Sequence, residues 1–305
     1  MKAPTLLVAI TWATAVCAHD KATPKAETIV LKNGDREVLA YQAAHSPSPD
    51  PAQPWFGRSG FIHPVRTPAG RIVTNDFPYD HLHQHGIMMA WTSSVVDGRK
   101  IDFWNSKKQQ GRIEHVKTVQ AGEDRITVKL RHLDITGTKP RVVLRESWEL
   151  IRVPHPTMHV FDLVSTQTNV AGTPVVLAKY HYGGLCVRGS EAWRTNGDFL
   201  TSEGKTRADG NHSRPRWVAM HGKIDDAGCG LACLGHPDNF RAPQPARLHP
   251  EFPYFSFAPM VTGEFTIAPG RPYVSRYRFA AFDGAPDSAK LDALWNDYAG
   301  RPEAP

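Results

Sequence analysis

Short stretches in which polar and apolar residues alternate recur along this chain, and this pattern restricts the fold more than any other feature. Side chains of a β-strand point alternately to its two faces, so such stretches are typical of strands with one buried face. The clearest reads Arg-Val-Val-Leu-Arg-Glu-Ser-Trp-Glu-Leu-Ile over residues 141–151. Others cover residues 28–31, 37–41, 111–120, 125–132, 157–166, 175–177, 264–267 and 273–282. Asn33-Gly34 separates the first two and is a strong hairpin signal.

Only the last part of the chain shows a helical pattern. Leu291, Leu294, Trp295 and Tyr298 have the spacing of one helix face. The 24 glycines and 25 prolines are spread along the chain, as turns between short strands require. The sequence therefore predicts an all-β fold, a large antiparallel β-sandwich formed as a single domain by residues 28–305, with one short C-terminal helix.

The first 18 residues have the composition of a secretory signal peptide. Lys2 gives a positive start, residues 6–16 are mostly apolar, and small residues precede a cleavage point near His19. Residues 19–27 are polar and are predicted to be flexible. We therefore expect a periplasmic or secreted protein, with lipoprotein anchoring through Cys17 as the weaker alternative. No other segment is apolar enough to span a membrane.

Three cysteines remain beyond this segment. Cys229 and Cys233 are close enough in sequence to pair across a turn, and Cys186 would then stay free. The equally good alternative is that all three are small buried residues.

The net charge is +6, and the basic residues are scattered rather than clustered. This distribution gives no indication of nucleic-acid binding. A mildly basic surface does favour anionic substrates. Nothing in the sequence indicates the oligomeric state.

Three histidines at alternate positions mark the most informative stretch for function. It reads Asp80-His81-Leu82-His83-Gln84-His85-Gly86. On a strand, the three imidazoles would point to the same face, and a glycine would let another backbone or a ligand approach. Clustered imidazoles can move protons, bind substrate hydroxyl groups or ligate a metal. The alternative is a surface turn that is rich in histidine.

A second stretch, residues 180–184, reads Tyr-His-Tyr-Gly-Gly and is followed by Arg188. Aromatic rings that cover sugar faces, with histidine and arginine that bind hydroxyl groups, suit carbohydrate recognition. The alternative is a structural turn. We expect both stretches to form one cleft, with His83, His181, Arg188 and Glu146 as catalytic residues. The residues expected to bind substrate there are His63, Asp80, His81, His85, Trp91, Trp104, Tyr182, Trp193, His236, Asn239 and Arg241.

Together, these motifs resemble those of a family that carries the label PmoA or methane oxygenase. The shared motifs are His63-Pro64, Pro68-Ala69-Gly70, the histidine stretch at 80–86, Tyr180 to Gly184 with Arg188, and the segment His236 to Arg241. The resemblance covers residues 55–285. The methane monooxygenase subunit of that name spans the membrane several times, whereas this chain has no candidate span, so the resemblance implies an uncharacterised family rather than that activity.

A weaker resemblance is to aldose 1-epimerases and the wider galactose-mutarotase-like supersandwich. Residues 80–86 and 181–185 occupy an order and spacing similar to two motifs of those enzymes. This resemblance implies a supersandwich fold. The asparagine of the first motif is missing here, and Glu251 and Glu264 are the candidates for the late catalytic glutamate of the epimerases.

These observations leave three hypotheses for function. The first is an exported carbohydrate-active enzyme, of lyase, epimerase or hydrolase type, that uses histidine for acid/base chemistry on a small-molecule sugar or glycoside without a cofactor. The second is an oxygenase-like or cupin-like enzyme with a divalent metal held by His81, His83 and His85, although the glutamate usual in such sites is absent. The third is a glycan-binding protein without catalytic activity.

Overall fold

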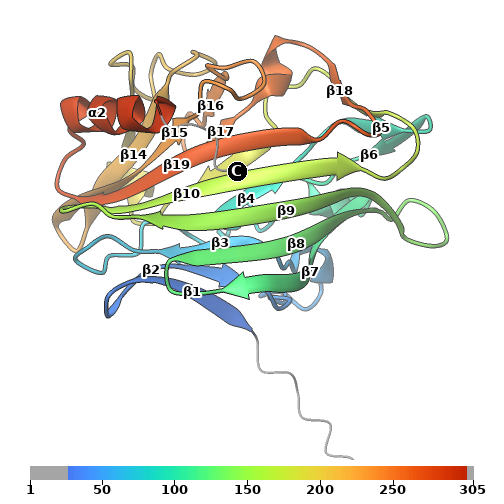
Figure 1. Ribbon diagram of the computed structural model, residues 1–305, viewed down its shortest axis with the longest axis horizontal. Coiled ribbons are helices and arrows are strands. Elements are labelled where there is room, and N and C mark those ends of the chain that lie inside the picture. The colour runs from blue at the N-terminus through green and yellow to red at the C-terminus, as the bar shows by residue number, and fades with distance from the viewer. Residues whose placement is uncertain (1–26, 301–305) are drawn as a thin grey trace, which may run out of the picture.

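A computed structural model describes residues 27–300 of the chain. The predicted signal peptide, Cys17 and all but the last residue of the predicted flexible segment lie outside the described residues. The described chain folds into three antiparallel sheets, two of them large, and Figure 1 shows the eight-stranded sheet in front of the strands of the seven-stranded sheet.

The first large sheet has seven strands and carries most of the loops that surround the candidate site. Its order is β1 (Thr28–Asn33), β2 (Arg36–Gln42), β3 (Phe61–Val65), β4 (Ile87–Ala90), β12 (Gly184–Arg188), β17 (Tyr254–Phe257) and β16 (Ala246–Leu248). The hairpin predicted at Asn33-Gly34 is confirmed, since β1 and β2 pair across this turn and Gly34 has a positive φ of 61°.

The second large sheet has eight strands and contains most of the long alternating stretches. Its order is β13 (Asp198–Thr201), β14 (Trp217–Ile224), β15 (Ala227–Gly235), β19 (Tyr273–Asp283), β10 (His159–Asn169), β9 (Arg141–Val153), β8 (Arg125–Asp134) and β7 (Gly111–Ala121). A third, small sheet contains β18 (Phe265–Ile267), β11 (Val175–Leu177), β5 (Ser94–Val96) and β6 (Arg99–Ile101).

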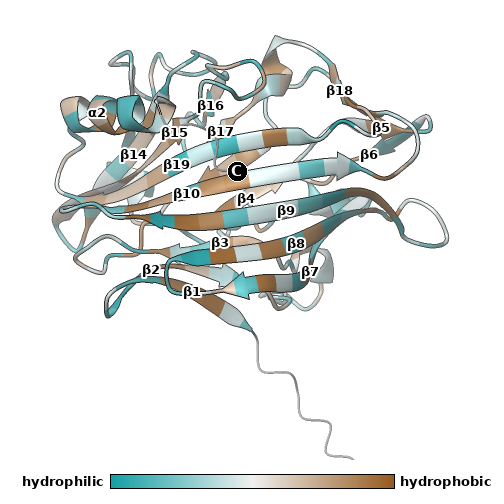
Figure 2. Ribbon diagram, in the orientation of Figure 1, coloured by the Kyte–Doolittle hydropathy of each residue, from teal (hydrophilic) through white to brown (hydrophobic). Residues whose placement is uncertain are grey.

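Apolar side chains fill the space between the two large sheets. Phe257 of β17 stacks on Tyr277 of β19 with ring centroids 5.7 Å apart, and Phe199 of β13 packs edge-on against Phe255 of β17. Apolar and polar residues alternate along β7, β8 and β9 in Figure 2, as strands with one buried face require. The predicted antiparallel β-sandwich is therefore confirmed.

The helices of the described chain are few and short. The longest is α2 (Ser288–Ala299), which begins where the Asp287 side chain accepts a hydrogen bond from the backbone N–H of Lys290. Leu291, Leu294 and Tyr298 pack with a second apolar cluster that includes Trp217 and Phe282. The short C-terminal helix is confirmed. The others are α1 (Trp193–Asn196) and three 3₁₀ helices, η1 (Pro54–Phe56), η2 (Ser106–Lys108) and η3 (Pro259–Thr262).

The described elements also bear on the expectations for the cysteines and for a membrane-spanning segment. Cys229 and Cys233 are both buried and free. Both lie on β15, where four residues span about 13 Å, beyond the reach of a disulfide. They are small buried residues, as is Cys186. None of the helices within residues 27–300 is long and apolar enough to cross a membrane. The extent of the domain, residues 28–305, stays a prediction.

The outer face of the seven-stranded sheet positions the loops of the candidate site. In β12, Val187 and Leu185 point into the core between the sheets, so Arg188 and Cys186 point to the opposite face. There Arg188 contacts Asp80 of the loop between β3 and β4. Tyr254 of β17 lies on the same face and packs against Trp104, which follows β6. Loops therefore cover this face of the sheet.

Candidate functional site

Two adjoining cavities lie among these loops. The inner cavity has a volume of about 330 Å³ and is lined by η1, the turn before β4, the residues around η2 and the start of β7. The outer cavity has a volume of about 540 Å³ and is lined mainly by residues 79–83 and by Asn105, Lys107 and Lys108. Phe56 and His83 line both cavities, so the two form one cleft. Its combined size suits a small organic ligand.

The histidine stretch is not the strand that the sequence predicts. Its backbone forms two successive turns, with hydrogen bonds from His81 N to Pro78 O and from Gln84 N to His81 O, and β4 begins only at Ile87. The three imidazoles therefore do not share one strand face. The expectation for Gly86 is confirmed: its φ is 40°, and a Cβ there would collide with the carbonyl oxygen of Ile62.

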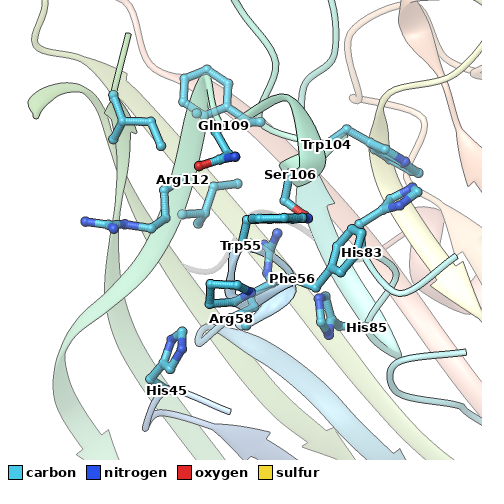
Figure 3. Close-up of a pocket in the computed structure, with 16 residues that line it drawn as sticks. His45, Trp55, Phe56, Arg58, His83, His85, Trp104, Ser106, Gln109 and Arg112 are labelled. Carbon is cyan, nitrogen blue, oxygen red and sulfur yellow. The ribbon is translucent and has the colours of Figure 1, made fainter. Parts of the chain in front are cut away.

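His83 stands where the inner and outer cavities meet. It is half-buried, and its ring contacts those of Phe56 and His81, at centroid distances of 6.5 Å and 5.5 Å. Neither ring nitrogen has a hydrogen-bond partner within residues 27–300. Burial, assisted by the nearby imidazoles of His81 and His85, lowers the pKa of His83 to about 3. The ring is therefore neutral at physiological pH, with both nitrogens available to a ligand. Figure 3 shows it beside Phe56 and Trp104.

His81 is held in a fixed orientation by a chain of polar contacts. Its Nδ1 lies 3.0 Å from a carboxylate oxygen of Asp80. Both Asp80 oxygens also accept hydrogen bonds from the guanidinium of Arg188, at 2.9 Å and 3.0 Å. Because a carboxylate only accepts, Nδ1 of His81 carries the proton and Nε2 is left as the acceptor. Arg188, which is completely buried, positions Asp80 and does not reach the cavities.

His85 and His63 lie behind the cleft. Nδ1 of His85 is 2.6 Å from Asp76, and the ring, which borders the inner cavity, is only 1% exposed. Burial lowers the pKa of His85 although Asp76 opposes the effect. His63 of β3 bonds Thr74 through Nδ1 and lines a separate, open hollow with Arg66 and Arg71. The structure therefore brings His81, His83 and His85 together and leaves His63 outside the cleft.

The inner cavity also carries polar groups that no described residue satisfies. Nε1 of Trp55, Oγ of Ser106 and Nε of Arg58 are all buried and have no hydrogen-bond partner within residues 27–300. All three residues line this cavity, together with the aromatic side chains of Phe56, Phe103 and Trp104. Figure 3 shows the Trp55 indole extended across the cavity. Buried donors normally have partners, so these groups indicate a polar ligand or ordered water.

The sequence does not predict Trp55, Arg58, Ser106 or Gln109 as site residues, although all four line the inner cavity. One signal was available for the first of them. Trp55-Phe56 directly follows the proline-rich segment 46–54, and a tryptophan in such a polar loop indicates a binding role. Ser106 and Gln109 lie in a run of polar residues that gives no comparable signal.

The second predicted constellation is only partly in the cleft. The Tyr182 ring packs against Trp104 with centroids 5.1 Å apart, and its hydroxyl group bonds the side chain of Asn105, which lines the outer cavity. His181 is exposed, packs between Tyr180 and Tyr182, and lines neither cavity. Its backbone carbonyl bonds His212. His181 therefore lies on the loop next to the cleft and not at its centre.

Three other predicted site residues lie in the core. Glu146 is 2% exposed, and its oxygens are bonded to His132, Trp148, Ser165 and Gln167. Trp91, 1% exposed, donates its Nε1–H to Gln167 at 2.7 Å. Trp193 is completely buried. None of the three lines the cleft. The catalytic role of Glu146 and the substrate-binding roles of the two tryptophans stay predictions.

The segment from His236 to Arg241 lies elsewhere and builds a turn. His236 packs its ring against Tyr298 of α2, and Asn239 bonds the backbone of Arg276 through both ends of its amide. Arg241 donates to the carbonyl groups of Pro259 and Gly263 at 2.7 Å each. Their side chains stabilise loops beside α2, so the prediction that they bind substrate in the same cleft is not supported.

The alternative metal site is not formed by this geometry. Within residues 27–300, no three or more His, Cys, Asp and Glu side chains are placed to hold a metal ion together. In particular, Nδ1 of His81 and of His85 face Asp80 and Asp76 respectively. In this arrangement, His81, His83 and His85 therefore do not fit a metal ion.

The chain belongs to a family described as a family of unknown function (DUF6807), whose model matches residues 28–296. Nothing in the comparisons supports the resemblance to the PmoA-labelled family, which stays a prediction. A comparison with curated proteins gave no match.

Eight chains of solved structures are similar to this chain, among them the following three. The heparan sulfate lyase HepC of Pedobacter heparinus has 11% identity and a TM-score of 0.40 over 82% of this chain and 33% of the lyase. The Slr1438 protein of Synechocystis has 9% identity and a TM-score of 0.43 over 85% of this chain and 96% of its own. A galactose mutarotase related enzyme of Lactobacillus acidophilus has 6% identity and a TM-score of 0.40 over 85% and 98%.

This chain spans about a third of the length of the lyase. At such identities and TM-scores, these likenesses carry no argument about activity, so the functional argument rests on the cleft alone.

Proposed function

We propose that this protein is an exported carbohydrate-active enzyme that binds a sugar or glycoside in the cleft and transfers protons through His81 and His83. The observation that carries the proposal is His83. A neutral imidazole stands at the junction of the two cavities, with both ring nitrogens unpaired within the described chain. The export part rests only on the sequence of residues 1–18.

The walls of the cleft suit a sugar. Trp55, Phe56 and Trp104 supply aromatic surface, against which the apolar faces of a sugar ring pack. Ser106 and Gln109 supply polar groups in the same cavity for its hydroxyl groups. A mainly apolar lining with a few placed polar groups is the usual composition of a small-molecule site.

His81 is the better proton acceptor of the two histidines. Asp80 holds its Nδ1–H, so Nε2 has its lone pair free on the side of the ring that faces away from the carboxylate. A carboxylate in this position also stabilises the imidazolium that forms when the proton arrives. His83 lies next to it, with ring centroids 5.5 Å apart, and can donate to or accept from the sugar as the proton moves.

The residues of the cleft favour proton abstraction next to a carbonyl group over hydrolysis. Glycoside hydrolysis usually needs two carboxyl groups on either side of the bond. Among the described residues, Asp80 is the only acidic one that lines either cavity, and Arg188 and His81 already occupy its oxygens. Epimerisation or elimination needs a base and a donor that stabilises the charge left by the proton. His81 can supply the base, and the neutral ring of His83 can supply the hydrogen-bond donor.

Deuterium exchange tests this proposal. The protein is incubated in D₂O with aldoses, uronic acids and their methyl glycosides, and carbon-bound deuterium and new products are followed by NMR. The proposal predicts exchange or turnover for at least one compound, reduced about 10²- to 10⁴-fold by His81→Gln, as for removal of a general base. His221→Gln is the matched control, because His221 is another half-buried histidine that lines neither cavity.

Binding without exchange or turnover would contradict the enzymatic proposal and favour a glycan-binding protein. Full activity in both His81→Gln and His83→Gln would exclude the assigned roles. Activity that is lost on chelation and restored by one transition metal would favour the metalloenzyme hypothesis instead.

A further inference from the structure

The inner cavity has an unusual charge composition. Within residues 27–300, its lining contains Arg58, Arg112 and the three histidines His45, His83 and His85, but no aspartate or glutamate. An arginine that lines a closed cavity is normally neutralised by a carboxylate. Here, the protein supplies no such counter-charge within the cavity.

Arg58 shows this lack of a counter-charge most clearly. It is only 9% exposed, and its Nη2 donates to the backbone carbonyl of Met89 at 3.2 Å. Its Nε is buried without a partner, and the guanidinium forms no ion pair with any residue of the described chain. Burial lowers the pKa of Arg58, but only to about 10, so the side chain is still a cation at neutral pH. A buried cation without a partner is costly.

Two carboxylates attract Arg58 from a distance, Glu146 more strongly than Asp76, and both are engaged elsewhere. Glu146 attracts Arg58 electrostatically through the core. Its oxygens, however, accept hydrogen bonds from Trp148, Ser165 and Gln167 and contact His132. Glu146 therefore offsets part of the charge from a distance, but it does not satisfy Nε of Arg58.

Two more unpartnered groups on the same cavity are donors. Nε1 of Trp55 can only donate, and Oγ of Ser106 can donate one hydrogen bond. With Nε of Arg58, the cavity offers three buried donors, of which two cannot accept. A ligand group with several acceptor oxygens and a negative charge matches this set, whereas a sugar hydroxyl group brings one donor for each acceptor oxygen.

We propose that the inner cavity binds an oxyanion group carried by the substrate, a carboxylate or a sulfate, through Arg58, Trp55 and Ser106. This inference rests on the proposed function, because it assigns an acidic sugar as the substrate class of the same cleft. The aromatic side chains then face the sugar ring, and His81 and His83 lie toward the outer cavity, where the reacting carbon is placed. A uronic acid fits this arrangement, and so does a sulfated sugar.

Calorimetric titration of matched pairs tests the inference. The probes are glucose with glucuronic acid, galactose with galacturonic acid, and glucose with glucose 6-sulfate, at constant ionic strength. At least one acidic member is expected to bind ten times more tightly than its neutral partner. The affinities of the uronic acids and of glucose 6-sulfate, compared with one another, show which oxyanion the cavity prefers. Equal affinity within every pair would overturn the inference.

Two variants identify the donors. Arg58→Met should abolish the preference for the acidic sugar and leave the affinity for the neutral one within threefold. Trp55→Phe keeps an aromatic ring, removes the N–H together with part of the indole and should reduce the preference several-fold, which also covers the case in which Arg58→Met does not fold. Arg131→Gln is the control, because Arg131 is an exposed arginine that is paired with Glu114, lines neither cavity and should leave the preference intact. A preference that survives both variants would overturn the inference.

The outcomes separate this inference from the proposed function. Sugars that bind and react without regard to their charge would overturn the oxyanion site and leave the enzyme proposal standing. Inorganic sulfate that binds in an Arg58-dependent way, with no sugar binding at all, would support the oxyanion site and contradict the proposed function.

Discussion

Two groups of histidine and charged residues in this protein look alike in sequence and differ in their surroundings. One lies in the core, where Glu146 is bonded to His132, Trp148, Ser165 and Gln167. The other lines the cleft, where His83, Arg58, Trp55 and Ser106 have polar atoms without partners. In the core group only Nδ1 of His132 is left unpaired, and that residue lines neither cavity.

This difference separates residues that hold the fold from residues that are available to a ligand. A buried polar group whose bonds are made within the protein contributes to specifying the core. A polar group that borders a cavity and lacks partners can gain them only from solvent or a ligand. Residue type alone does not distinguish the two cases, since glutamate and histidine are common in both.

The largest effect that we expect is from Glu146→Ala. This change removes the acceptor of four hydrogen bonds and leaves the donors of His132, Trp148, Ser165 and Gln167 unsatisfied in the core. The free energy of unfolding should fall by about 3–5 kcal/mol. Urea denaturation followed by far-ultraviolet circular dichroism measures this loss. If Glu146→Ala instead leaves the midpoint unchanged, Glu146 is not part of a structural network, and the comparison fails.

Arg188→Met should have a similar or somewhat smaller effect. Asp80, whose side chain is 6% exposed, would lose its bidentate partner and keep its contacts with His81 and, at 3.9 Å, with Arg194, so the loss should be up to about 3–5 kcal/mol. The double variant Asp80→Asn with Arg188→Met should recover much of this loss, because the buried charge is then gone. A double-mutant cycle measured by urea denaturation gives the coupling between the two residues. A coupling energy near zero would show that Arg188 does not hold Asp80.

The smallest of these effects concerns the dependence of stability on pH. Burial, with His81 and His85 nearby, lowers the pKa of His83 from its ordinary 6.5 to about 3. The unfolded chain therefore binds a proton between these values that the folded protein does not, and stability falls as the pH decreases from 6.5 toward 3. In His83→Gln, the free energy of unfolding should fall less steeply as the pH decreases. The difference in slope should correspond to the uptake of up to one proton.

Urea midpoints measured between pH 4 and pH 7 test this change in slope. The two proteins should differ little in their dependence on pH above 7, where the imidazole is neutral in both folded and unfolded states. The same slope in both proteins below pH 6.5 would mean that His83 is not held neutral by its surroundings.

Much of the fold could be predicted because its long strands follow a local rule. Alternation locates β7, β8, β9, β10 and β19 to within a few residues, and spacing locates α2. Strands β4, β12 and β17 are short and buried on both faces, so their sequences do not alternate. The order of strands in the three sheets depends on pairings between distant segments, which no local pattern reveals.

The site was harder to predict because its geometry is made by turns. Alternate histidines share a face only on a strand, and Pro78 with the residues after it folds instead into two turns. The motif did place His81 and His83 correctly in a cleft. Arg58 and Trp55 could not be predicted as site residues, because their role depends on burial and on the hydrogen-bond partners they lack. Neither property can be read from a sequence.

The most direct test of the central claim compares the histidines of the two groups in one experiment. The protein is labelled with ¹⁵N in its histidine rings and titrated with glucose, galactose and their uronic acids, and the ring nitrogen resonances are assigned with His81→Gln, His83→Gln and His132→Gln variants. Our account predicts that a binding sugar shifts the resonances of His81 and His83 and leaves those of His132 unchanged. Shifts confined to histidines outside the cleft, or a sugar that binds without moving either His81 or His83, would contradict it.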